Sequence, residues 1–162
     1  MISPEKTMDP MNPTKTFSYA GMPVTDNKND APSFSAASLT LPQGLIGFPG
    51  FHEFGLLDLP DPRLAQFKLL QAINDPDLSF FLLPLDPENG PIDAEDLNKA
   101  LAILEIEQNC ASVLSIVTLR KNGDVFSATT NLRAPIFIDA EKKTGRQYVL
   151  PNDKYNIRHT LA

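Results

Sequence analysis

The chain has 162 residues, of which 42% are hydrophobic and 21% charged, the balance of a soluble protein with one domain-sized core. Its formal net charge of -6 repels phosphate backbones, which argues against direct nucleic-acid binding. The same charge would steer the protein toward a basic protein, but it is not evidence for such a partner. The 15 prolines argue against long helices and favour turns and edge strands.

The first part of the chain differs in composition from the rest. Residues 1–33 are rich in Pro, Asn, Asp, Lys and Thr and poor in branched aliphatic side chains. Such a segment buries too little apolar surface to offset the entropy cost of ordering its backbone. We therefore predict a disordered N-terminal tail over residues 1–33 and one β domain over residues 34–162.

Short apolar runs separated by turn signals follow the tail. The predicted strands are residues 39–41, 54–59, 67–73, 80–85, 113–119, 125–129, 136–138 and 147–150. Hairpin turns are predicted at residues 121–124, centred on Asn-Gly, and at residues 142–145. The almost wholly apolar run 80–85 predicts a strand that is covered on both faces. In the loop 44–50, glycines are predicted to fold Leu45, Ile46 and Phe48 back over the core.

One helix is predicted, beginning after Asp93. Aspartate is a good N-cap residue, and the acidic residues Glu95 and Asp96 in the first turn suit the helix dipole. Its apolar stripe consists of Leu97, Ala100, Leu101 and Leu104. The stripe indicates a helix that covers the sheet, and an exposed partner-binding groove is the alternative. The whole pattern predicts a mainly β fold, a small antiparallel barrel or roll with one covering helix.

A sharp corner is predicted between the strands at 125–129 and 136–138. Asn131 tolerates turn conformations and bonds nearby backbone, and Pro135 suits the beginning of a strand. Arg133 has no such backbone role. We predict that Arg133 and nearby Gln147 either lie on a partner-binding surface or, in the case of Arg133, brace the C-terminal segment through a backbone carbonyl or Asp153.

The sequence offers no catalytic or metal-binding constellation. His52 and His159 are the only histidines, and neither has a second ligand at metal-binding spacing. The single cysteine, Cys110, excludes an internal disulfide, and its apolar surroundings predict a buried, inert thiol. No apolar run reaches the roughly 18 residues that span a bilayer, and no signal-peptide pattern is present, so a cytoplasmic location is expected. A small-barrel hydrolase would need one of the histidines against a carboxylate, and an RNA binder would need a basic stripe with aromatic residues.

Five sequence blocks, in order, resemble those of the flagellar assembly factor FliW family. They are GLIGFP at 44–49, LQ at 70–71 followed by DPDLSF at 75–80, TNLRAPI at 130–136, GRQYVL at 145–150, and Tyr155 with Arg158. The resemblance extends over residues 39–161. It departs from the family pattern in the extended N-terminal tail and in residues 86–107.

The resemblance implies a small cytoplasmic β protein without catalytic activity or cofactor. Members of the family bind flagellin before export and also bind the translational regulator CsrA, so that free flagellin levels control flagellin translation. A flagellin-specific export chaperone that does not bind CsrA is the alternative. Partner-binding residues are expected among six positions: Gln71, Asn131, Arg133, Gln147, Tyr155 and Arg158.

Overall fold

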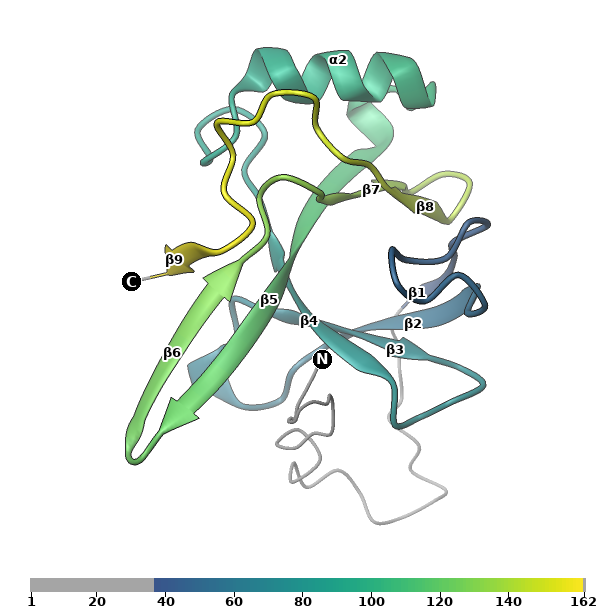
Figure 1. Cartoon of the computed structure of the whole chain (residues 1–162). Helices are drawn as coiled ribbons and strands as arrows, with labels where there is room; N and C mark the ends of the chain where they lie inside the picture. Colours follow the sequence, from purple (N-terminus) through teal and green to yellow (C-terminus); the bar gives the residue numbers. More distant parts are fainter. Residues whose placement is uncertain (1–36, 162) are drawn as a thin grey trace. The chain divides into compact units, whose positions relative to one another are not determined.

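The computed structural model describes residues 37–161, so the predicted N-terminal tail lies outside the described residues. The chain divides into two compact units. Figure 1 labels their strands and the α-helix. Among the described residues, unit 1 contains residues 37–39 and Glu53–Phe81, and unit 2 contains Thr40–His52 and residues 82–161.

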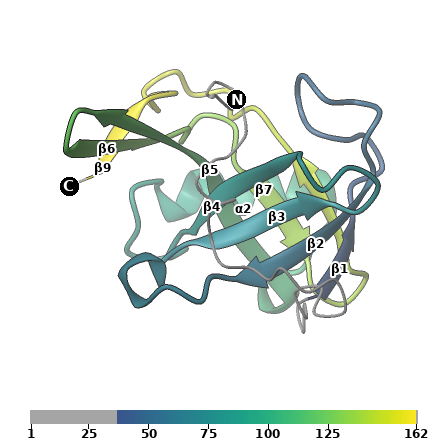
Figure 2. The ribbon, with the colours of Figure 1, turned by 90° about the horizontal axis from the view of Figure 1, so that it is seen from below.

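Unit 1 is a sheet built around one antiparallel hairpin. Its elements are β1 (Ala37–Thr40), β2 (Glu53–Asp58), the 3-10 helix η3 (Pro62–Leu64), β3 (Lys68–Ala72) and the beginning of β4 (Ser79–Pro84). The strands lie in the order β4-β3-β2-β1, and Figure 2 shows β3 next to β2. Strand β2 pairs with β3 from Phe54 opposite Ala72 to Asp58 opposite Lys68. The buried side chains of this hairpin include Phe54, Leu57, Leu69 and Leu70.

Unit 2 holds the helix and the remaining strands. Its elements are α2 (Ala94–Leu104), the 3-10 helix η4 (Gln108–Cys110), β5 (Ala111–Asn122), β6 (Val125–Thr130), β7 (Ile136–Asp139), β8 (Thr144–Gln147) and β9 (His159–Leu161). The strand order is β1-β8-β7-β5-β6-β9, with an additional β4–β5 pairing. The pairs β5–β6, β5–β7, β6–β9 and β7–β8 are antiparallel. The pair β1–β8 is parallel, with Thr40 opposite Thr144.

The mainly β fold class with one α-helix is confirmed for the described residues. The pairings β1–β2–β3–β4–β5–β7–β8–β1 have the connectivity of a seven-stranded barrel, as the short strands and hairpin signals predicted. Strands β6 and β9 continue the sheet beyond this ring of pairings.

Helix α2 covers a core of unit 2, as its apolar stripe predicted. Leu97, Ala100 and Leu101 are buried in one cluster with Val113 and Phe137, and Leu104 packs against the cluster partly exposed. Figure 1 shows α2 on the side of the sheet that carries β7. The stripe is therefore a core contact and not an open groove.

The start of α2 differs from the prediction in its chemistry. Asp93 occupies the N-cap position, but its side chain makes no capping hydrogen bond. The carboxylate instead pairs with the ammonium of Lys154, and the Asp93 N–H donates to the hydroxyl of Tyr155 at 3.1 Å. One of the backbone N–H groups left without a helical partner at this end, that of Asp93, is therefore satisfied by the C-terminal segment.

Both predicted hairpin turns are wrong by one or more residues. The β5–β6 loop is Gly123–Asp124, because Asn122 still pairs with Val125, and Gly123 takes a φ of 65°. Glycine as the first loop residue, with positive φ, is the arrangement of a type II′ turn. In the β7–β8 loop the residue with left-handed φ is Lys143, at 56°. Thr144 and Gly145, which were predicted to belong to the turn, lie within β8.

Two burial predictions are also wrong. Strand β4 is not covered on both faces: among its residues Leu82 is buried, while Ser79, Phe80 and Phe81 are half-buried. An antiparallel strand needs only one covered face, so an apolar run overstates its burial. In the loop after β1, Leu45 is buried as predicted, but Ile46 is 62% exposed.

We expect Gly44→Ala to lower the free energy of unfolding by about 1–3 kcal/mol, because a side chain at left-handed φ is strained. Gly44 has a φ of 68°, and an added Cβ would lie 2.6 Å from the carbonyl oxygen of Phe48. Gly50→Ala is the matched control, since a Cβ there meets nothing within 4 Å. Urea denaturation of both variants checks this. Equal stability of the two variants would show that the loop shifts freely.

Candidate partner-binding site at the corner after β6

The corner between β6 and β7 is set by Asn131, as predicted. Its side-chain oxygen Oδ1 accepts hydrogen bonds from the backbone N–H groups of Arg133 at 3.0 Å and Ala134 at 3.1 Å. The Asn131 N–H itself donates to the carbonyl of Ile116 at 2.9 Å. Pro135 is fully buried immediately before β7. The corner is therefore a rigid turn in which one amide satisfies two backbone donors.

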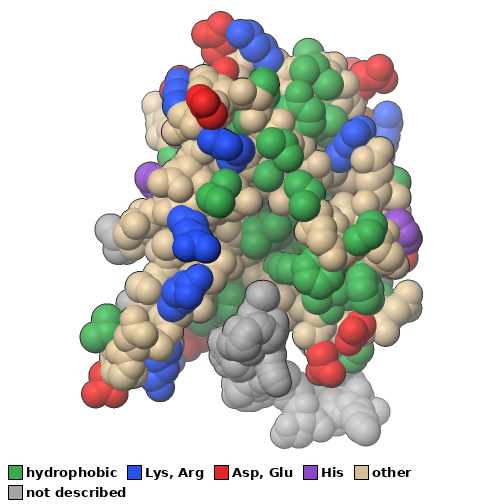
Figure 3. All heavy atoms as spheres, viewed as in Figure 1, with side chains coloured by type: hydrophobic (Ala, Val, Ile, Leu, Met, Phe, Trp, Pro, Cys, Tyr) green, Lys and Arg blue, Asp and Glu red, His purple; other side chains and the backbone are tan. Residues whose placement is uncertain are grey.

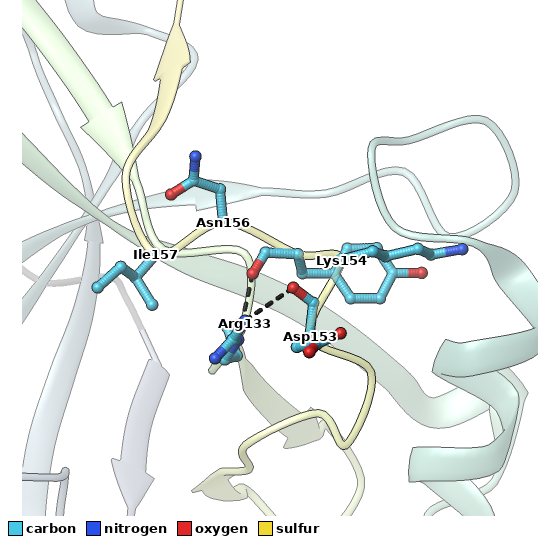
Figure 4. Close-up of a pocket in the computed structure, with 6 residues that line it drawn as sticks. Arg133, Asp153, Lys154, Asn156 and Ile157 are labelled. Atoms are coloured by element: carbon cyan, nitrogen blue, oxygen red, sulfur yellow. Dashed lines mark hydrogen bonds between the residues drawn. The ribbon is translucent and has the colours of Figure 1, made fainter.

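Arg133 braces the C-terminal segment. Its Nε donates to the carbonyl of Tyr155 at 3.2 Å, and its Nη2 donates to the carbonyl of Asp153 at 2.8 Å. Figure 4 shows the guanidinium directed at these two carbonyls. The Leu150 N–H returns a bond of 2.7 Å to the Arg133 carbonyl. Of the two roles predicted for Arg133, the structure shows the brace.

Arg133 and the C-terminal segment line an open surface hollow of about 370 Å³. Its lining residues are Arg133, Asp153, Lys154, Tyr155, Asn156 and Ile157 (Figure 4). Ile157 is 55% exposed, and Asn156 is exposed as well. An exposed aliphatic side chain beside an amide and fixed charges is a composition that suits contact with a protein partner.

Tyr155 joins the C-terminal segment to the start of α2. The side chain is buried, and its hydroxyl donates to a carboxylate oxygen of Asp96. Burial raises the pKa of Tyr155, and the hydrogen bond to Asp96 raises it further. Lys154 lies over the Tyr155 ring, 5.2 Å from its centroid, and its bond to Asp93 raises the lysine pKa. These contacts make Tyr155 a structural residue of the segment that borders the hollow.

We expect the stability of the wild-type protein to fall as pH rises above 10.0, the ordinary pKa of tyrosine. Because the folded-state pKa of Tyr155 is raised, the unfolded chain loses this proton first, and the unfolded state gains as pH rises through that window. Tyr155→Phe should remove this part of the pH dependence. Urea midpoints between neutral pH and pH 11 check this, with Tyr148→Phe as control. A slope unchanged by Tyr155→Phe would contradict the buried hydrogen bond.

Gln147 connects two loops of unit 2. Its side-chain Oε1 accepts from the N–H of Ile46 at 2.8 Å, and its Nε2 donates to the carbonyl of Ala134 at 3.0 Å. The Gln147 amide therefore connects two segments: the loop that carries the exposed Ile46 and the corner that carries Arg133. Long-range side-chain bonds of this kind leave no local sequence pattern, so the link could not be predicted.

The other two predicted site residues have different surroundings. Gln71 lies in unit 1, where its Nε2 donates to the carbonyl of Pro76 at 3.0 Å and closes the turn before β4. Arg158 lies just before β9 with an exposed side chain, and its N–H donates to Asn156 Oδ1 at 2.8 Å. Unit 2 thus brings Arg133 and Tyr155 together at the hollow, and Asn131 shapes the turn that carries Arg133. Gln71 belongs to another turn.

The described residues contain no group of three or more His, Cys, Asp or Glu side chains arranged to hold a metal ion. Cys110 is half-buried rather than buried, and its thiol lies 3.5 Å from Glu141 Oε1. Burial and the nearby carboxylates raise the pKa of Cys110, which disfavours the reactive thiolate. In residues 37–161, no helix is both long and apolar enough to span a membrane.

Comparison with known proteins gives one family. The family model described as "FliW protein" matches residues 27–161. The flagellar assembly factor FliW of Caldanaerobacter subterraneus subsp. tengcongensis is 32% identical over 124 residues, covering 74% of this chain and 78% of the relative. That of Desulfitobacterium hafniense is 34% identical over 123 residues, covering 74% and 77%.

A solved structure agrees with these matches. The crystal structure of a flagellar assembly factor FliW superimposes with a TM-score of 0.59 at 31% identity, covering 76% of this chain and 84% of that one. With a family model that matches most of the chain and relatives above 30% identity, the chain belongs to the FliW family of flagellar assembly factors.

Proposed function

We propose that this protein is a non-catalytic cytoplasmic factor that binds flagellin before export and, in competition with flagellin, binds a CsrA-type translational regulator. The observation that carries the proposal is the match of residues 27–161 to the FliW family. When flagellin is scarce, the free factor binds the regulator and relieves repression of flagellin translation. When flagellin accumulates, it occupies the factor by mass action and releases the regulator.

Two features of the molecule support a binding role. The formal net charge of -6 suits encounter with a basic RNA-binding regulator, since opposite charges speed association. The hollow beside Arg133 presents the exposed Ile157 on a segment held by hydrogen bonds to Arg133 and Tyr155. A preorganised segment loses little conformational entropy on binding.

We further propose that five of the six predicted site residues are structural and that the sixth contacts the partner. Asn131, Arg133, Gln147 and Tyr155 hold the surface in shape through the hydrogen bonds described above, and Gln71 does the same for its own turn. Arg158, with its exposed side chain, contacts the partner directly together with Ile157.

Binding measured by calorimetry with purified flagellin and purified CsrA-type regulator from the same bacterium tests the proposal. We expect each to bind alone and flagellin to displace the regulator. Binding of flagellin alone would identify a flagellin-specific export chaperone, and binding of neither would overturn the proposal.

A matched pair of variants tests the place of binding. Ile157→Asp puts a charge into the hollow, and Ile103→Asp puts one on the outer face of α2, where the native side chain is equally open at 61% exposure. We expect Ile157→Asp to weaken at least one partner by about tenfold or more, as for a central contact, and Ile103→Asp to change neither.

A further inference from the structure

The outer three strands of unit 2 carry rows of hydroxyl groups on one face. Thr118 of β5 lies opposite Thr129 of β6, which lies opposite Thr160 of β9. Directly opposed residues project from the same face of a sheet, so the three side chains form one row across the strands. The neighbouring row pairs Arg120 with Ser127, two residues further along each strand.

This face is open and its charge is positive. Thr118, Arg120, Ser127 and Thr160 are exposed, and Thr129 is half-buried. We name these five residues the Arg–Thr face. Arg158 is exposed directly before β9, two residues from Thr160. Figure 3 shows Lys and Arg side chains following one another along the β5–β6 hairpin.

Neither of these arginine side chains is bound to another residue that the structure describes. Within residues 37–161, the guanidinium groups of Arg120 and Arg158 make no hydrogen bond or ion pair, whereas Arg133 and Arg63 are bound to protein oxygens. The Arg–Thr face includes no carboxylate, although the whole chain carries 20 acidic residues against 14 basic ones. The guanidinium groups of Arg120 and Arg158 are thus exposed positive charges on a protein whose net charge is negative.

The spacing of the donors suits an elongated ligand. Residues two apart on a strand are separated by about 7 Å, and neighbouring strands by about 4.8 Å. From Arg120 to Arg158 the face therefore extends about 13 Å along the strands and about 10 Å across them, with the threonine row between the two arginines. Guanidinium and hydroxyl groups both donate hydrogen bonds to carboxylate oxygens.

We propose that the Arg–Thr face, together with Arg158, docks an acidic segment of a protein partner. Carboxylates of the segment bind Arg120 and Arg158, and the threonine hydroxyls hold the chain between them. A protein segment fits better than a nucleic acid, because no residue of this face is aromatic and a base would have no ring to stack on. The proposal goes beyond the flagellin and regulator switch and does not depend on it.

Charge reversal tests the proposal on the full-length protein. The probes are a fluorescent oligoglutamate peptide and an oligouridylate of equal length, titrated at low ionic strength and followed by anisotropy. The variants are Arg120→Glu, Arg158→Glu and the double variant. Lys142→Glu is the control, since it makes the same charge change at the exposed β7–β8 turn. Thermal melts of each variant confirm folding.

We expect the peptide to bind the wild-type protein and each arginine reversal to weaken it by about fivefold or more, with little change in Lys142→Glu. Raising the salt concentration should weaken the wild-type complex. Three results would overturn the proposal: no peptide binding, equal loss in the control variant, or tighter binding of the oligouridylate than of the peptide. The last result would identify the face as a nucleic-acid site.

Discussion

Replacing Leu97 with alanine should lower the free energy of unfolding by about 2–5 kcal/mol, the range for large-to-small changes in a close-packed core. Leu97 is 1% exposed and belongs to the cluster that α2 shares with Val113, Phe137 and Leu150. Truncation removes apolar contacts and leaves a cavity that neighbours on several elements would have to move together to fill. Urea denaturation of the purified variant measures the change.

Ile103→Ala is the matched control for Leu97→Ala. It removes a similar aliphatic side chain from the same helix, but Ile103 is 61% exposed, so the expected loss is within about 0.5 kcal/mol. Equal losses at the two positions would show that α2 contributes through helix propensity alone. A large loss only at position 97 would confirm that its apolar stripe carries the packing between helix and sheet.

Much of the fold follows from local sequence patterns. The stripe on α2 and the alternating or apolar runs of β2, β3, β5 and β7 are dictated by the periods of helix and strand, and these elements lie where they were predicted. Turn positions were less predictable. At 121–124 both Asn122 and Gly123 tolerate positive φ, and strand pairing gave that conformation to Gly123. At 142–145 the residue with positive φ is Lys143 and not Gly145, because Gly145 pairs within β8.

The candidate site was only partly predictable for a different reason. The Asn131 side chain bonds backbone N–H groups two and three residues further along the chain. This local interaction is typical of asparagine in turns, so it could be predicted. Gln147 bonds Ile46 across 101 residues, and Tyr155 bonds Asp96 across 59. Such links depend on the finished tertiary structure. The exposure of Ile157 likewise depends on how Arg133 holds the segment that contains it.

Replacing Arg133 with alanine should lower the free energy of unfolding by about 1.5–3 kcal/mol, because hydrogen bonds from a charged donor contribute about that much. The variant loses the bonds to the carbonyls of Asp153 and Tyr155 and leaves these two carbonyls without this donor. Arg146→Ala is the control, since that side chain is exposed on β8. Thermal and urea melts measure the difference between the two variants.

Partner binding by the folded fraction then separates the two roles of Arg133. A brace acts by holding the segment that carries Ile157, so Arg133→Ala should weaken partner binding and loosen residues 153–157 together, which amide hydrogen exchange detects. If Arg133 instead touches the partner, binding falls while exchange in that segment and the melting temperature stay at wild-type values. Because the guanidinium is already directed at two backbone carbonyls, we expect stability, exchange and binding to change together.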